Sequence, residues 1–182
     1  MERVSGHAYD VDMDGDERIE IRPAPSGGLG IFARSDIRSG DYIHTVHYDR
    51  EITPESPLNA ELGEKYEHCA YPDGKIMLVA SPGRYMNHSC NPNACYRYDG
   101  QIARAYARRD IQSGAEIRVD YLINNPGGDS WSCNCGSRRC RGKTGTSFFS
   151  LPLEFQKEYF PLLADWFKQR FPEETARLER QL

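Results

Sequence analysis

The stretch that most constrains this chain is residues 84–93, which read RYMNHSCNPN. Asparagine and serine side chains compete with the backbone for hydrogen bonds, and Pro92 lacks an amide donor, so the stretch is poorly suited to a helix interior. It predicts a tight, hydrogen-bonded loop that follows a short apolar strand at 76–80. A lone loop of this kind is usually a polar turn that satisfies its own backbone. Two distant features indicate more than that here: three closely spaced cysteines at 133–140, and Asp120-Tyr121 at the end of a strand-like run.

The length and composition limit the classes of protein to consider. The chain has 182 residues, enough for one domain with a core and too few for two large ones. Charged residues make up 27%, no apolar run approaches the roughly 18 residues that span a bilayer, and the first residues lack the apolar stretch of a signal peptide. We therefore expect an intracellular protein, cytoplasmic or nuclear and not bound to a membrane. Its six cysteines are then thiols or metal ligands rather than disulfides. The net charge of −4 disfavours direct binding of nucleic acid.

Alternating polar and apolar residues predict a mostly β domain followed by helices. The expected strands are 18–22, 31–33, 42–46, 76–80, 95–98, 101–107 and 116–121, with a hairpin turn at Asp99-Gly100. Thr53 and Pro54 resemble a helix start and predict a helix that ends between residues 66 and 69. From residue 150 apolar side chains recur at helical spacing, with a division at Pro161 and a second helix starting near Pro172.

The cysteines at 133, 135 and 140 have the spacing of metal ligands. A closed structural zinc site needs four ligands in a tetrahedron, and this motif supplies three. From the residues alone the fourth can be Cys69, Cys90, Cys95 or His88, and the alternative is a set of unrelated thiols. Cysteines outside such a site are typically small core residues, which is what we expect of Cys69 and Cys95.

Four motifs, taken in order, resemble the SET-domain protein lysine methyltransferases. Residues 84–93 resemble the central signature of that family. Residues 28–33 resemble its Gly-x-Gly motif, and residues 107–121 resemble the segment that ends in its catalytic tyrosine. Residues 133–142 resemble its post-SET zinc motif. Together the motifs cover roughly residues 18–142, and four matches in the family's order are far more specific than any one alone.

The resemblance implies a mostly β SET-domain (β-clip-like) fold of short curved sheets, with a C-terminal helical segment. A pseudoknot would bring residues 84–93 against residues 115–121. The chain would divide into a flexible N-terminal segment (1–17), a SET domain (18–123), a post-SET zinc-binding motif (131–143) and the helical segment (150–182).

The resemblance also implies a protein lysine N-methyltransferase that moves a methyl group from S-adenosylmethionine to the ε-amine of a lysine. Tyr121 would be the catalytic residue. The cofactor would contact Gly28, Leu29, Gly30, Arg84, Asn87, His88, Tyr121 and Trp131, and the substrate channel would be lined by Tyr96, Val119 and Tyr121. One structural zinc ion would be held by Cys90, Cys133, Cys135 and Cys140, with Cys90 as the fourth ligand. The partner would be a protein with an exposed lysine, for example a basic histone-like tail.

Two channel positions bear on how many methyl groups are added. Val119 stands where relatives often carry Phe or Tyr, and its smaller side chain favours di- or trimethylation. Tyr96 falls where some relatives place a channel tyrosine and could restore the restriction; alternatively it is a cross-strand partner of Tyr98 or Tyr106. A departure lies at 44–48, which reads HTVHY where many relatives carry Glu-Tyr-x-Gly-Glu, so the resemblance does not define that part of the wall.

Two other functions compete with methyl transfer. One is a non-catalytic SET-fold module that binds basic peptides, and the other is a structural zinc module used in assembly. Tyr121, Asn87, His88 and the cysteine set are all present, which favours the enzyme. Binding and turnover of S-adenosylmethionine would separate the three.

Overall fold

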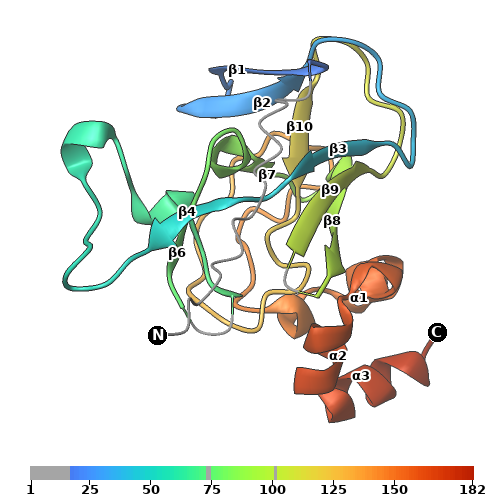
Figure 1. Cartoon of the computed structure of the whole chain (residues 1–182). Coiled ribbons are helices and arrows are strands. Elements are labelled where there is room, and N and C mark those ends of the chain that lie inside the picture. Colours follow the sequence, from blue (N-terminus) through green and yellow to red (C-terminus); the bar gives the residue numbers. More distant parts are fainter. Residues whose placement is uncertain (1–16, 73–74, 101) are drawn as a thin grey trace, which may run out of the picture.

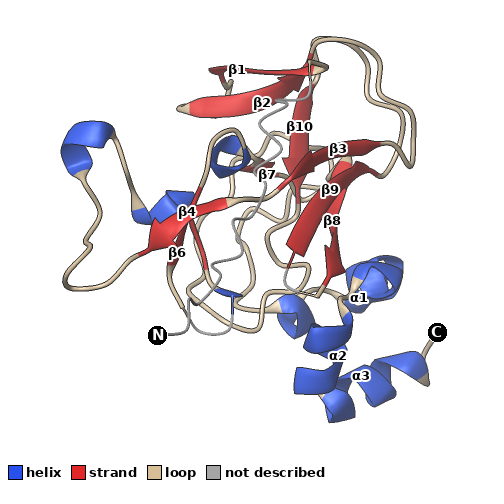
Figure 2. Cartoon of the chain, in the orientation of Figure 1, coloured by secondary structure: helices blue, strands red, loops and turns tan. Residues whose placement is uncertain are grey.

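The computed structural model describes residues 17–72, 75–100 and 102–182, so the expected flexible N-terminal segment lies outside the described residues apart from Glu17. The described chain forms three small sheets with helices at the C-terminal end. Figure 1 shows the sheets gathered around β10, with α1, α2 and α3 together on one side of them. Figure 2 shows that strands and loops dominate up to this helical segment. The expectation of a mostly β fold with a C-terminal helical segment is confirmed.

The largest sheet has the order β1 (Ile19–Pro23), β2 (Leu29–Ala33), β10 (Glu116–Val119) and β7 (Asn87–His88). β1 and β10 both pair with β2 in the antiparallel sense, whereas β10 pairs with β7 in parallel. The Ser89 amide extends this pairing by donating to the Val119 carbonyl at 2.8 Å. The two segments that the resemblance predicted to meet therefore lie side by side.

The other two sheets have three strands each. One has the order β3 (Tyr42–Thr45), β9 (Ile102–Ala107) and β8 (Ala94–Asp99), and it contains the predicted hairpin, with Gly100 at a positive φ of 59°. The other has the order β4 (Tyr48–Glu51), β6 (Met77–Val79) and β5 (Cys69–Ala70).

A first apolar core fills the space between the first two sheets. On β9 and β10 alternate side chains are buried, as in a half-buried sheet. Its members are Ile19, Ile31, Ala33, Ile37, Ile43, Met86, Ala94, Ala105, Ala107, Ile111, Ile117 and Val119. Through Ile117 and Val119, the core holds β10, the strand that leads to Tyr121, in place.

The C-terminal helices form a second apolar core. They are α1 (Leu153–Tyr159), α2 (Asp165–Arg170) and α3 (Pro172–Glu179), with 3₁₀ turns at Phe148–Ser150 and Phe160–Leu162. The predicted division at Pro161 and the start at Pro172 are both confirmed, and α2 is an additional helix between them. The buried members of this core are Leu122, Phe148, Leu151, Phe155, Tyr159, Leu163, Ala164, Phe167 and Leu178. Leu122, a buried member of this core, follows the predicted catalytic residue Tyr121 directly in the sequence.

The predicted helix between residues 53 and 69 is wrong. The structure has a bridge between Thr53 and Ser56 and two short 3₁₀ turns, Ala60–Leu62 and Tyr66–His68, none of whose residues is buried. Gly63 ends the first turn at a φ of 70°. Since no residue of these turns is buried, a helix of this length would gain too little from packing to form. A further 3₁₀ turn, Gly83–Tyr85, leads into β7.

Among the described residues, no helix is long and apolar enough to cross a membrane.

Candidate active site and cysteine centre

The first part of the site forms where β2, β7 and β10 meet. The Asn87 side chain donates from Nδ2 to the Leu29 carbonyl at 2.9 Å and to Glu116 Oε1 at 2.8 Å. Gly30 leaves room for this contact, because a Cβ at that position would lie 2.6 Å from Glu116 Oε1. The predicted Gly-x-Gly segment and the predicted Asn87 are thus joined directly.

Three aromatic rings lie together beside this junction. The centroid of the His88 ring is 5.3 Å from that of Tyr121 and 6.0 Å from that of Trp131, and the Tyr121 and Trp131 centroids are 6.2 Å apart. His88 Nδ1 accepts a hydrogen bond from the Tyr121 amide at 3.2 Å. Burial outweighs the nearby Asp120 carboxylate and lowers the pKa of His88 to about 4, which keeps the ring neutral. Its proton then resides on Nε2, which lies 3.4 Å from Cys90 Sγ.

The Tyr121 hydroxyl points into the protein rather than into solvent. It donates to the Met86 carbonyl at 2.7 Å, although the residue as a whole keeps 41% of its surface exposed. Burial of the hydroxyl end raises the pKa of Tyr121, so the group stays protonated and can donate. The predicted catalytic residue therefore has one exposed edge and one enclosed polar end.

The two remaining channel candidates lie close to the first core. Val119 is a buried member of that core, and Tyr96 packs against the core while partly buried. The strand register places Ala105 opposite Tyr96, so Tyr106 is not its directly paired residue. Burial raises the pKa of Tyr96 well above its usual range.

The polar contacts of Arg84, a predicted cofactor residue, lead away from this junction. Its Nε donates to the Val79 carbonyl at 2.9 Å, and its guanidinium pairs with Asp49. Both contacts tie the turn before β7 to the sheet of β4 and β6.

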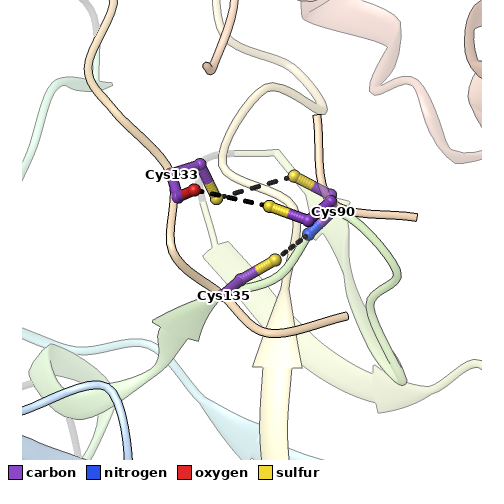
Figure 3. A group of neighbouring side chains, drawn as sticks. Cys90, Cys133 and Cys135 are labelled. Carbon is purple, nitrogen blue, oxygen red and sulfur yellow. Dashed lines mark hydrogen bonds between the residues drawn. The ribbon is translucent and has the colours of Figure 1, made fainter. Parts of the chain in front are cut away.

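Four cysteine sulfurs converge beside His88. The Sγ atoms of Cys90, Cys133, Cys135 and Cys140 all lie within 4.8 Å of one another, a group that can hold a metal ion. Figure 3 shows the side chains of Cys133 and Cys135, which share one stretch of the chain, approaching Cys90, which belongs to another. Of the four candidates for the missing ligand, Cys90 is the one in this group. Cys95 is buried in the protein as expected, whereas Cys69 is only half-buried on β5.

The surroundings of the sulfurs suit thiolates that bind a metal. Backbone amides approach three of them: Cys90 N to Cys135 Sγ and Arg141 N to Cys90 Sγ at 3.5 Å each, and Gly142 N to Cys140 Sγ at 3.4 Å. Burial disfavours the charged form of Cys135, but hydrogen bonds from Ser137 and the Cys90 backbone outweigh it and lower the pKa of this thiol. Burial raises the pKa of Cys90, and a bound cation would reverse that penalty. The Cys90 and Cys133 sulfurs are 3.6 Å apart, close to the roughly 3.8 Å expected between ligands of tetrahedral zinc.

A buried ion pair connects the cysteine segment to the end of β10. Arg141 Nη1 lies 2.7 Å from Asp120 Oδ2, and Arg141 Nη2 lies 3.0 Å from Asp120 Oδ1. The Asp120 side chain is fully buried and that of Arg141 is 9% exposed. Both residues stand inside the recognised motifs, but nothing in the sequence indicates that their side chains meet.

The helix α1 covers the cysteine cluster from the other side. Tyr159 donates its hydroxyl to the Cys90 carbonyl at 3.4 Å. Glu158 accepts from Arg108 at 3.1 Å and from Arg139 at 2.7 Å, and the Arg139 guanidinium lies 4.4 Å from the centre of the Phe155 ring. The C-terminal segment is therefore part of the wall of the cysteine centre.

Comparison with known proteins agrees with these motifs. The SET domain family model matches residues 28–122, more than half of the chain. One curated relative is the histone-lysine N-methyltransferase ASHH3 of Arabidopsis thaliana. It is 30% identical over 171 residues, which cover 86% of this chain and 46% of the relative. A second, the H3 lysine-36 specific histone-lysine N-methyltransferase of Aspergillus oryzae, is 29% identical over 70% of this chain and 14% of the relative. A third, human histone-lysine N-methyltransferase SETD2, is 27% identical over 70% of this chain and 5% of the relative.

This chain therefore spans less than half the length of each of these relatives. The family match includes the Gly-x-Gly segment, the 84–93 loop and the segment from β10 to Tyr121. On that match, the chain belongs to the SET domain family.

Proposed function

We propose that this chain is an S-adenosylmethionine-dependent protein-lysine N-methyltransferase. The observation that carries the proposal is the position of the Tyr121 hydroxyl, bound to the Met86 carbonyl beside Asn87 and His88. The names of the relatives support the same reaction, since each is a histone-lysine N-methyltransferase.

The residues around His88 suit the proposed cofactor. Leu29, Tyr121 and Trp131 each keep about two fifths of their surface exposed at this junction, which is unusual for large apolar side chains. An adenine ring needs apolar faces to stack on and backbone groups to hydrogen-bond. Gly28, Leu29, Gly30, Asn87, His88 and Trp131 would supply these, and Arg84 would act indirectly by holding the turn before β7.

The remaining task of the chain is to present a neutral lysine. S-adenosylmethionine supplies an electrophilic methyl group when bound. A free lysine amine has a pKa of about 10.4 and must lose its proton to act as a nucleophile. Apolar walls made by Val119 and the ring of Tyr96 disfavour the charged amine. The Tyr121 hydroxyl and the Met86 carbonyl would then orient the amine, which is catalysis by positioning.

We propose that Cys90, Cys133, Cys135 and Cys140 bind one structural zinc ion and that residues 131–143 form a post-SET motif. Such an ion would tie the segment that carries Trp131 to the 84–93 loop, which carries His88. The SET domain would comprise residues 18–123 and the helical segment residues 150–182.

The substrate class we propose is a basic protein tail with an exposed lysine, with histones first, in an intracellular setting. The test is transfer of labelled methyl from S-adenosylmethionine to purified histones and to a whole-cell extract. Label in a protein band supports the enzyme. Cofactor or peptide binding without transfer to either sample would overturn it in favour of a non-catalytic SET-fold module.

A further inference from the structure

A polar cleft lies next to the cysteine cluster, and Asn91, Arg118 and Cys135 are among the residues that line it. Its volume is about 380 Å³, and it opens between the loop after Cys90, the strand β10 and the turn between Cys135 and Cys140. The residues around it are Ser89, Asn91, Asn93, Arg109, Glu116, Arg118, Cys135, Gly136, Ser137 and Arg138. Three arginines thus face one cleft that has a single carboxylate in its lining.

That carboxylate is already neutralised within the protein. Glu116 pairs with the Arg118 guanidinium and accepts a hydrogen bond from Asn87, and its side chain is only 6% exposed. Arg118 also donates to the Cys135 carbonyl at 2.7 Å. Glu116 and Arg118 therefore balance each other and leave the other two arginines of the cleft without an acidic partner.

Arg109 and Arg138 carry the unbalanced charge. Among the described residues, the Arg109 guanidinium bonds only to the two oxygens of Asn91, at 3.3 and 3.1 Å, and both are neutral acceptors. Within the same part of the chain, Arg138 makes no hydrogen bond or ion pair. Two guanidinium groups without an acidic partner can match a tetrahedral oxyanion, because guanidinium binds phosphate oxygens in pairs.

We propose that this cleft binds phosphate groups, with Arg109 and Arg138 as the charged contacts. The phosphate belongs either to a free anion or to the backbone of a nucleic acid that the protein contacts. The net charge of −4 disfavours nucleic-acid binding by the chain as a whole, but recognition of a phosphate depends on the local charge of the cleft.

The experiment is calorimetric titration of the full chain with inorganic phosphate and, separately, with a short DNA duplex over a series of salt concentrations. The variants are Arg138→Gln, Arg109→Gln/Arg138→Gln, and a control with the same charge change on the distant helices, Arg170→Gln/Arg180→Gln. Arg138→Gln is included because Arg109 holds Asn91 and its loss could disturb the cysteine loop. Zinc content and methyl transfer to a peptide are measured for every variant.

We expect wild type and the control to bind phosphate alike, and the double cleft variant to bind at least about tenfold more weakly, as loss of charged hydrogen bonds requires. If DNA binding weakens in parallel and its salt slope falls by about 2, the phosphates belong to a nucleic acid backbone. If DNA binding is absent or unchanged, the ligand is a free phosphate.

Two results would overturn the proposal. One is equal phosphate binding by wild type and both cleft variants. The other is loss of zinc from Arg138→Gln with phosphate binding unchanged, which would mean that the arginine balances the charge of the cysteine centre instead. Neither result bears on methyl transfer, which the peptide assay measures separately.

Discussion

Arg141 and Asp120 form a two-point ion pair that is almost wholly removed from solvent. The pair joins the cysteine segment to the residue that immediately precedes Tyr121. Removing one member of such a pair leaves a buried charge without compensation, which usually costs more than the pair itself contributes.

The first prediction follows from that pair. Arg141→Gln should lower the free energy of unfolding by about 3–5 kcal/mol, because the Asp120 carboxylate stays buried. Urea denaturation followed by fluorescence measures this. The double variant Asp120→Asn/Arg141→Gln should regain a large part of the loss, since no charge remains. A double variant as unstable as Arg141→Gln alone would show that the charge is not the cause.

The second prediction concerns the metal. Freshly purified protein should contain one zinc per chain by elemental analysis, and Cys135→Ser should lose it, since zinc ligation in small sites carries about 10 kcal/mol or more of folding free energy. Loss of zinc should also disorder the segment after Asn124. Cys69→Ser is the matched control: its sulfur lies outside the cluster, so zinc should be retained. Wild-type protein without zinc would contradict the assignment.

The third prediction concerns the Tyr121 hydroxyl. Tyr121→Phe should reduce methyl transfer by about two orders of magnitude or more, the range for a positioning or polarising group. The fold and cofactor binding should persist, because only one oxygen is lost. Tyr106→Phe on β9 should keep the parental rate, as its ring packs on Tyr42 away from the site. Turnover of Tyr121→Phe at the parental rate would rule out the role.

The number of methyl groups added is the subject of the fourth prediction. Val119 is small and buried behind the site, which favours a channel that admits di- and trimethyl products. Mass spectrometry of a good peptide substrate at long reaction times measures the product. Accumulation of monomethyl peptide alone would contradict the role given to Val119 and indicate that Tyr96 prevents further methylation. Tyr96→Phe should then allow di- and trimethyl products.

The fifth prediction concerns pH. Hydrogen bonding to Arg139, opposed by burial and aided by Arg108, lowers the pKa of Glu158 in the folded protein. A lowered carboxyl pKa contributes stability above the pKa of the unfolded chain, and this contribution disappears as the pH falls through the folded value. Wild type should therefore exceed Glu158→Gln in thermal stability at neutral pH and lose that advantage on acidification. A difference that does not change with pH would attribute the effect to packing.

The sequence predicted strands such as β9 and β10 because their alternating runs each have one face to bury, whereas β4 and β5 were not predicted. The helix expected from Thr53 failed because its start signals are local: Pro57 and Gly63 interrupt the segment, and Leu62 and Tyr66 stay exposed, so packing does not stabilise a helix. The two-residue strand β7 has no periodicity to detect, and its pairing with β10 came from the family resemblance. Pairs such as Asp120 with Arg141, or Glu158 with Arg139, depend on which side chains the fold brings together, and no spacing along the chain encodes that.

The parallel pairing of β7 with β10 also has a kinetic consequence. The β8–β9 hairpin lies entirely between these strands in the sequence and can form from local contacts, whereas β7 and β10 must first close the loop that contains it. Closing that loop costs chain entropy before any contact across it is gained. Asn87, His88 and Tyr121 are brought together only by this closure, so we expect the proposed cofactor site to form late in folding.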